Sequence, residues 1–444
     1  MKITHLNSAC QLVESNGVKI LIDPWLVDGE FYGSWYTFPS LTDFDFNTLN
    51  DVDFIYISHI HPDHLSKLTL EKLDKNIPVL IHNFKDKFVK INIESMGFKT
   101  RELESNVDTF LGPNININII PAGYCNPELC SKIFGCGKME VNYGSTIIDS
   151  LCVISDGEHT LLNVNDCPYP IAYKAMDKVL EKYEKIDFLL VGYGGASPYP
   201  QCFSNYTNEE KIKMGENHKN YYFNSGLDYI NKVKPTHFMP HAGTYILGGV
   251  NAKLEKYKAL NDIYETNKKF SELNSNNSKG ILLNTNEYFD LTTHDQSSPY
   301  IHHTTEERDD YLEEIRKIKY DFEQDDIPDI DFLKDLCIKS NKRFNEKREQ
   351  LGLYSDMVIY LYLSEDLMAQ ISFKGEKIKF VKVKEIKDKQ YISFKVNPKL
   401  LVKILKGPRY AHWNNAGIGS HVEYHRHPDV YERGVYFCMN YFHS

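Results

Sequence analysis

Three imidazoles and one carboxylate lie close together between Ser58 and His64, in the sequence SHIHPDH. A divalent transition metal binds neutral imidazole nitrogens and carboxylate oxygens at about 2.0–2.2 Å, so its ligands must converge on one point. A tight loop can bring such closely spaced side chains together. Clustered surface histidines without chemistry are the alternative interpretation, but a random chain rarely produces the H-x-H-x-D-H spacing. The segment therefore predicts a metal site.

A strand must present this cluster to the rest of the site. Residues 53–58 (DFIYIS) are largely apolar and run directly into His59, which places the histidines at the carboxyl end of a strand. Strand ends are where α/β folds commonly place chemistry. Upstream, Asn16-Gly17 predicts a hairpin between short strands. Downstream, a helical pattern at 66–75 precedes an apolar stretch at 78–83, which gives the order strand, loop, helix, strand.

Strands and helices keep alternating to about residue 295. The pattern predicts a strand in HTLLNVND before Asp166, a helix at 172–185 and a strand THFMP that ends near His241. A final strand is expected in the stretch GILLNTNEYFDL, which closes this region near residue 292. This alternation in two halves favours a layered α/β sandwich.

The remaining chain divides into two further parts. Residues 296–352 are charged and helical in character, which favours a solvated helical connector after a first domain at 1–295. Strand patterns return in 353–444 and predict a small α+β accessory domain. Four histidines near the end of the chain fit no closed metal framework, so a polar surface or a domain interface is the favoured interpretation for His412, His421, His425 and His427.

The histidine cluster resembles the motif of the metallo-β-lactamase superfamily, and the resemblance covers residues 1–295. It implies an αββα sandwich that holds one or two divalent metal ions, iron or zinc. In that family the first two histidines bind one metal, the Asp-His pair binds a second, a later aspartate bridges them, and a histidine at a strand end is the last ligand. Carried over to this chain, the resemblance implies as metal ligands His59, His61, Asp63, His64, Asp166 and His241. It also implies that catalysis uses Asp63, Asp166 and His241.

One ligand of the family pattern is missing from this sequence. A third histidine for site one should lie about twenty residues before Asp166, and the segment Glu140–Ser145 contains none. We therefore expect one tight metal and a second that is weak, completed by water or absent. His159 beside Asp156-Gly157 is interpreted as a turn residue. Other donors that could complete site one are a substrate group or Cys125, Cys130, Cys136, Asn142 or Ser145.

Further segments resemble the subgroup that contains CMP-N-acetylneuraminate hydroxylase. They are DPWL, ISHIHPDHLS, NVNDCPYP, GYGGASPYP, KPTHFMPHAGTY and the tail segment EYHRHPDVY. That subgroup carries a Rieske iron–sulfur domain, whose cluster needs two cysteines and two histidines, and this chain has no C-x-H followed by C-x-x-H. Oxidation would then need a separate electron donor or a substrate that supplies its own electrons.

The resemblance leaves two enzymatic functions open. An iron-dependent enzyme would oxidise a sugar, a nucleotide sugar or a similar polar metabolite. A metal-dependent hydrolase would instead use bound water, whose pKa the metal lowers toward about 7, to attack an ester, lactone, amide or phosphodiester. In either case Tyr193 and Ser197, in the loop YGGAS, are candidates to bind the small-molecule substrate. A degenerate fold kept only for binding is disfavoured because most ligand positions are filled.

Composition narrows the function classes further. The chain has 444 residues, 42% hydrophobic and 25% charged, which is typical of a globular protein with more than one domain. A net charge of −10 argues against general nucleic-acid binding, which relies on a basic surface. No apolar run is long enough to span a membrane. Nine scattered cysteines and the absence of a signal-peptide pattern favour a cytoplasmic location.

Overall fold

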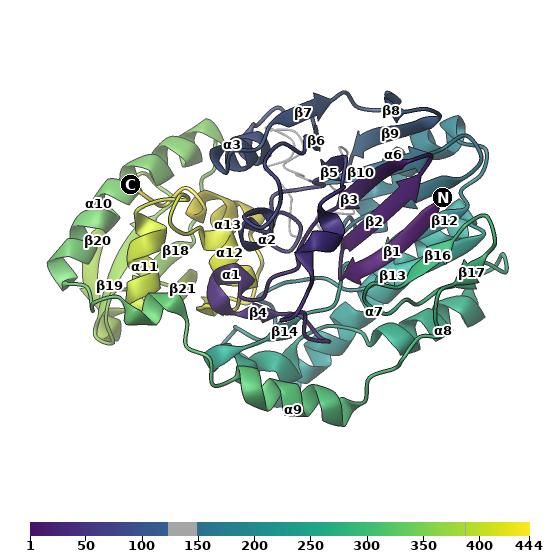
Figure 1. Ribbon diagram of the computed structural model, residues 1–444. Coiled ribbons are helices and arrows are strands. Elements are labelled where there is room, and N and C mark those ends of the chain that lie inside the picture. Colours follow the sequence, from purple (N-terminus) through teal and green to yellow (C-terminus); the bar gives the residue numbers. More distant parts are fainter. Residues whose placement is uncertain (123–148, 387) are drawn as a thin grey trace.

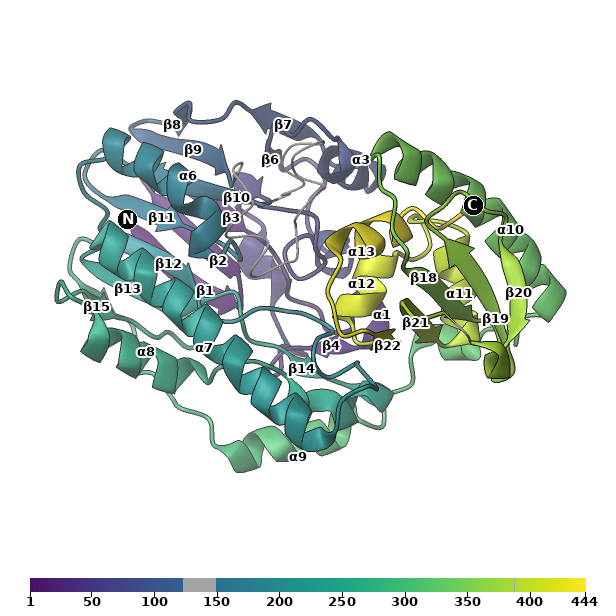
Figure 2. The same ribbon diagram turned by 180° about the vertical axis from the view of Figure 1, so that it is seen from behind.

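The computed structural model describes residues 1–122, 149–386 and 388–444. The N-terminal part consists of two facing β-sheets with helices outside them, and the C-terminal part is built around a smaller sheet (Figures 1 and 2). Among the described residues, no helix has both the length and the apolar character needed to cross a membrane.

The first sheet contains the strand that leads to the histidine cluster. Its strand order is β17-β16-β1-β2-β3-β5-β6-β7, and the strands from β3 to β7 are parallel. The predicted hairpin between β2 and β3 is confirmed, because Asn16 and Gly17 both have positive φ angles, of 50° and 78°. The strands are β1 (Lys2–Asn7), β2 (Cys10–Ser15), β3 (Val18–Ile22), β5 (Phe54–Tyr56), β6 (Val79–His82), β7 (Thr100–Leu103), β16 (Tyr288–Asp290) and β17 (Asp295–Gln296).

The second sheet has the order β15-β13-β12-β11-β10-β9-β8. Its strands β11, β12, β13 and β15 are parallel, so their carboxyl ends lie at one edge of the sheet. The strands are β8 (Thr109–Gly112), β9 (Ile115–Pro121), β10 (Ser150–Ser155), β11 (Thr160–Asn163), β12 (Phe188–Gly192), β13 (His237–His241) and β15 (Lys279–Gly280). A separate two-stranded sheet pairs β4 (Trp35–Tyr36) with β14 (Ile246–Leu247).

Three apolar layers hold the sandwich together. Because side chains alternate along a strand, Ile20 and Ile22 face the second sheet while Leu21 faces the helices outside the first. Figure 2 shows helices across the outer face of the second sheet. These are α6 (Tyr169–Lys182), α7 (Asn208–Val233) and α8 (Ile263–Leu273); on the first sheet lie α2 (Lys67–Leu70) and α3 (Phe88–Ser95). The order helix, sheet, sheet, helix confirms the αββα sandwich.

One predicted strand is divided between the two sheets. The stretch GILLNTNEYFDL starts as β15 at the edge of the second sheet and ends as β16 in the first. Ile281 and Leu283 are buried between the sheets, so the apolar run marks a crossing of the core rather than one continuous strand.

The C-terminal part has its own sheet and core. Its strand order is β20-β19-β18-β21-β22, and α10 packs on it through Leu333, Leu336, Cys337 and Phe344. The sequence favoured a solvated connector here, and the structure shows that one face of α10 belongs to this core. The elements are β18 (Val358–Tyr362), β19 (Leu367–Ser372), β20 (Lys379–Lys382), β21 (Tyr391–Val396), β22 (Val422–His427), α10 (Ile330–Gln350), α11 (Pro398–Leu405), α12 (Trp413–Ile418) and α13 (Arg433–Met439).

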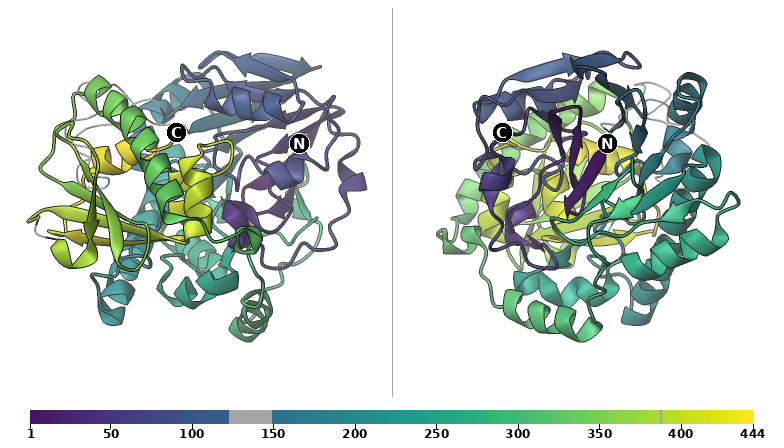
Figure 3. Two further views of the ribbon diagram at one scale, coloured as in Figure 1. Left: turned by 90° about the vertical axis from the view of Figure 1, so that its left-hand side faces the viewer. Right: turned by 45° about the vertical axis from the view of Figure 1, so that its right-hand side comes forward.

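The two parts lie side by side, with α1 and α12 in contact at their boundary (Figures 1 and 3). A backbone bridge between Phe203 and Tyr424 also joins them. Remaining short elements are α1 (Glu30–Gly33), α9 (Thr305–Ile315), η1 (Phe46–Leu49), η2 (Gly249–Tyr257), η3 (Asp321–Gln324) and η4 (Val383–Glu385). The domain ranges 1–295, 296–352 and 353–444 stay predictions.

Candidate metal centre

The candidate site lies where strands from both sheets end. The loop after β5 carries the histidine cluster, the turn after β11 carries Asp166, and His241 is the last residue of β13. Asn165 has a left-handed backbone, with φ of 56°, which turns the chain sharply before Asp166. The site is therefore built at the carboxyl ends of strands, as the sequence predicted.

Three of the predicted ligands converge on one point. One ligand atom from each of His59, His64 and Asp166 lies within 4.8 Å of the other two, and both imidazoles are buried. His64 Nε2 is 3.2 Å from Asp166 Oδ2 and 3.5 Å from Asp63 Oδ2. This arrangement can hold a divalent metal ion.

Two further predicted ligands, His61 and His241, lie beside this group. His61 Nδ1 faces His59 Nε2 at 2.9 Å, which brings together the two histidines assigned to site one. His241 is buried, and the Asp166 carboxylate is among the charges that act on its imidazole. The structure thus brings all six predicted ligand residues into one region, and their roles as metal ligands stay predictions.

Several buried polar atoms at the site lack a hydrogen-bond partner. Among the described residues, neither ring nitrogen of His241 has one, and the same is true of His64 Nε2 and Asp166 Oδ1. Leaving such groups buried and unpaired costs about 1–3 kcal/mol each, so an orphaned cluster needs an explanation. These atoms are all metal-ligand types, and the donor set of imidazole nitrogens and carboxylate oxygens fits a divalent transition metal.

Asp23 orients the His64 imidazole through Nδ1, the ring nitrogen that faces away from the ligand cluster. Its Oδ2 accepts a hydrogen bond from His64 Nδ1 at 2.9 Å, so in the neutral imidazole Nε2 is the unprotonated, metal-binding nitrogen and is directed at Asp63 and Asp166. The same carboxylate accepts bonds from the backbone N–H and the hydroxyl of Ser58, at 2.7 and 2.6 Å. Asp23 comes from the DPW segment that follows β3, and its sequence position alone did not indicate a role at the site.

Charge coupling decides which groups hold protons when no metal is bound. Burial raises the pKa of Asp63 to about 7 against the opposing effect of His64. Burial lowers the pKa of His64, but the carboxylates of Asp166, Asp63 and Asp23 outweigh it and hold that pKa well above its usual value. Burial lowers the pKa of His241 to about 3, so this imidazole is neutral. A divalent cation would take the place of the protons on Asp63 and His64.

Asp149 is a carboxylate of the site that sequence reasoning missed. Its Oδ1 lies 3.7 Å from His59 Nδ1, and burial raises its pKa to about 6 against the effect of His61. It stands 17 residues before Asp166 and directly before β10, near the position where the family pattern requires a third histidine. The family pattern calls for a histidine near residues 140–145, whereas the available signal in this sequence is a carboxylate four residues further on.

Tyr222 is a further residue of the site that sequence reasoning missed. A side chain at Gly195 would overlap the Tyr222 ring, so the absence of a Cβ there lets the phenol approach the loop after β12. Burial and the Asp166 carboxylate together raise the pKa of Tyr222 to about 12, which keeps the phenol protonated. Tyr222 lies on α7 between Tyr221 and Phe223, and a run of aromatic residues on a helix indicates ordinary packing.

The two predicted substrate residues occupy different surroundings. Tyr193 is buried, its hydroxyl is 2.7 Å from the Thr244 hydroxyl, and its ring packs against Gly243. The Ser197 hydroxyl is partly exposed and accepts a hydrogen bond from the Tyr199 backbone N–H at 3.1 Å. Their roles in substrate binding remain predictions.

The alternative donors for site one are only partly covered by the structure. His159 lies in the turn between β10 and β11, with Nδ1 3.6 Å from Asp156 Oδ2, as the turn interpretation requires. The segment 140–145 lies outside the described residues, as do the remaining candidates Cys125, Cys130, Cys136, Asn142 and Ser145.

Comparison with known proteins adds an independent line of support. A family model described as a beta-lactamase superfamily domain matches residues 2–121. A Mycobacterium tuberculosis protein named as a Rieske 2Fe-2S iron-sulfur protein is 26% identical over 246 residues, which are 55% of this chain and 44% of that protein. The cytidine monophosphate-N-acetylneuraminic acid hydroxylase of Macaca mulatta is 26% identical over 273 residues, which are 60% of this chain and 42% of the hydroxylase.

The matched regions are less than half the length of these two relatives. Among solved structures, isothiocyanate hydrolase from Delia radicum gut bacteria aligns with a TM-score of 0.47 and 16% identity, over 65% of this chain and 99% of that chain. The family-model match and the relatives agree with the αββα architecture described above. The chain therefore has a metallo-β-lactamase fold and resembles the subgroup that contains CMP-N-acetylneuraminate hydroxylase.

Proposed function

We propose that this chain is a metal-dependent enzyme that oxidises a sugar, a nucleotide sugar or a similar polar metabolite with iron. The observation that carries the metal-dependent part is the convergence of His59, His64 and Asp166, whose ligand atoms lie within 4.8 Å of one another. We assign the metal to this group, together with His61, Asp63 and His241. Iron or another divalent ion at this position would supply Lewis acidity and, for iron, one-electron chemistry.

Two features support iron over zinc. Histidine and carboxylate donors with open positions suit non-haem iron, and Asp63, Asp166 and Asp149 all lie among the histidines of the cluster. The names of the two relatives, an iron–sulfur protein and a hydroxylase, point in the same direction. A separate protein or a reducing substrate would then supply the electrons.

The surrounding residues define what the chain itself contributes. Asp23 keeps His64 in one tautomer, and the unpaired Asp166 Oδ1 can accept a hydrogen bond from a bound substrate or water. Tyr222 keeps its proton at neutral pH and can therefore donate a hydrogen bond to an oxygen of the substrate. Such polar groups around the cluster favour a substrate rich in hydroxyl or carboxylate groups.

Hydrolysis is the second candidate, and one observation favours it. Asp166 is 31% exposed while its Oδ1 is buried, so the carboxylate borders both the cluster and the opening. A carboxylate in that position can hold a water molecule and take a proton from it, as hydrolysis of an ester or lactone requires. Asp166 and Asp63 would act as the catalytic carboxylates, and His241 would complete the ligand set.

Metal analysis of the full chain, purified without oxygen, tests the proposal. We expect iron near stoichiometry, and oxygen consumption by the iron-loaded chain when a reductant and a panel of nucleotide sugars are supplied. Zinc alone, with turnover of nitrophenyl esters or lactones by the zinc-loaded chain, would establish hydrolysis instead. His64→Ala, Asp166→Ala and His241→Ala should each lose metal, whereas His159→Ala should keep it; full metal content in all three ligand variants would overturn the assignment.

A further inference from the structure

Helix α12 of the C-terminal part reaches the metal centre of the N-terminal part. Its Asn414 Oδ1 lies 3.0 Å from His61 Nε2, although the two residues are 353 positions apart in the sequence. A carboxamide oxygen can only accept, so the imidazole must donate its Nε2–H in this contact. His61 then has its unprotonated nitrogen, Nδ1, on the side of His59.

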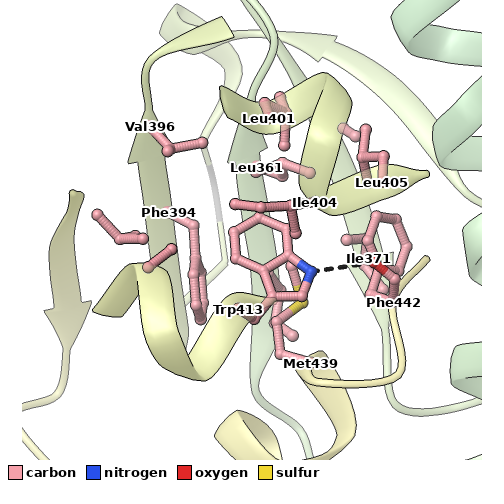
Figure 4. Close-up of a cluster of buried hydrophobic side chains, with 14 of the residues drawn as sticks. Leu361, Ile371, Phe394, Val396, Leu401, Ile404, Leu405, Trp413, Met439 and Phe442 are labelled. Carbon is pink, nitrogen blue, oxygen red and sulfur yellow. Dashed lines mark hydrogen bonds between the residues drawn. The ribbon is translucent and has the colours of Figure 1, made fainter. Parts of the chain in front are cut away.

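Neighbouring residues hold α12 in place within its own domain. Trp413 packs among apolar side chains of the C-terminal core, and its Nε1–H donates to the Phe442 carbonyl at 3.0 Å (Figure 4). His412 caps the helix, since its Nδ1 accepts from the Asn414 backbone N–H at 3.3 Å. The two residues that precede Asn414 therefore hold its backbone in place.

Polar contacts also dock this region onto α1 of the N-terminal part. The backbone N–H of His412 donates to the Tyr32 hydroxyl at 2.7 Å, and His421 Nε2 donates to the Phe31 carbonyl at 2.7 Å. A Cβ at Gly419 would lie 2.8 Å from that same carbonyl, so the close approach requires glycine. These contacts fix the position of α12 relative to the loop that carries His59 to His64.

The contact at His61 matches the contact at His64. In both cases one ring nitrogen is bonded to an oxygen acceptor and the other faces the cluster, which is how metal-ligating histidines are usually held. The difference lies in the origin of the acceptor. His64 receives its acceptor from the same domain, through Asp23, whereas His61 receives it from the C-terminal domain.

We propose that Asn414 is a positioning residue of site one, and that the C-terminal domain completes the metal centre by holding His61 through it. This inference rests on the metal centre proposed above. Asn414 is exposed and His61 is half-buried, so the contact lies at the opening of the site. An acceptor in partial contact with water should contribute at the lower end of the 10- to 100-fold range known for such partners, about tenfold in metal affinity.

Three variants of the full chain separate this role from general docking. Asn414→Ala removes the acceptor, Asn414→Asp keeps an oxygen in the same place, and Asn415→Ala changes the adjacent residue of α12, whose side chain bonds to Tyr32 instead. Each metal-free variant is titrated with Co²⁺, and the visible absorption reports affinity and coordination. Nitrogen NMR of the imidazole rings, with the His61 signals identified by their loss in His61→Gln, reports its tautomer without metal.

We expect Asn414→Ala to lower the affinity of site one for Co²⁺ about tenfold and to change the absorption spectrum of the Co²⁺ bound there. The same substitution should shift His61 away from the Nε2–H tautomer. Asn414→Asp should restore both readouts, and Asn415→Ala should match the wild type. Unchanged affinity and tautomer in Asn414→Ala would overturn the inference, as would an equal loss in Asn415→Ala or a failure of Asn414→Asp to restore. Absence of Co²⁺ binding by the wild type would instead overturn the metal centre itself.

Discussion

Asp23 Oδ2 and His64 Nδ1 lie 2.9 Å apart, although 41 residues separate them in the sequence. Both side chains are almost completely buried, with exposures of 0% and 1%. The parallel pairing of β3 with β5 places Ile22 opposite Tyr56, so the residues after each strand emerge side by side. A buried carboxylate on this ring nitrogen fixes the tautomer and the direction of the metal-binding nitrogen.

Replacing Asp23 should therefore weaken metal binding without removing a ligand. Asp23→Asn keeps the shape but loses the charge, and we expect the affinity at site two to fall by about 10- to 100-fold. The matched control is Asp53→Asn, an exposed carboxylate that accepts a backbone bond from Lys19 at 2.8 Å and lies outside the cluster. Isothermal titration of metal-free protein measures both; equal affinity in the two variants would contradict the role given to Asp23.

Asp149 should contribute to binding of the second, weaker metal ion. Asp149→Ala removes the carboxylate nearest to His59 Nδ1, and we expect the weaker metal equivalent to disappear while the tighter one remains. Asp177→Ala, on the outer helix α6, removes a carboxylate that is 51% exposed and should leave both equivalents intact. Metal stoichiometry after dialysis checks this. Two retained equivalents in Asp149→Ala would show that site one is completed by another donor.

Metal affinity should fall as the pH is lowered from 8 to 6. The pKa of Asp63 is raised to about 7 and that of His64 lies well above its usual value, so both groups hold protons in metal-free protein near neutral pH. Metal must displace these protons, which lowers the affinity about tenfold per pH unit for each proton released. Titration in two buffers of different ionisation enthalpy counts the protons. An affinity independent of pH would mean that these groups are not displaced.

Trp413 should contribute strongly to the stability of the C-terminal domain. Its side chain is 4% exposed and lies in the core shown in Figure 4, so Trp413→Ala should lower the free energy of unfolding by about 3–5 kcal/mol. Tyr410→Ala, at a position 58% exposed, should change it by less than about 0.5 kcal/mol. Urea unfolding followed by circular dichroism provides the measurement. Equal effects of the two substitutions would show that the core does not depend on Trp413.

Much of the candidate site could be predicted from the sequence because its ligands follow local patterns. The cluster from His59 to His64 is short, and the apolar strand before it places it at a strand end. Asp166 and His241 also follow apolar strands, and the order of these segments matches a family pattern. Runs of β-branched and aromatic residues likewise predicted the strands β18, β19 and β21 of the C-terminal sheet, because such composition is a local property of the sequence.

Other features could be decided only by the tertiary structure. The sequence by itself determined the ligand cluster, the layered fold and the strands that carry the ligands, since each depends on residues close together in the chain. Asp23 beside His64, Asp149 beside His59 and Asn414 on His61 depend on strand register and on the docking of two domains. Register and docking result from the sum of many weak contacts between distant segments, and no single residue pattern encodes that sum.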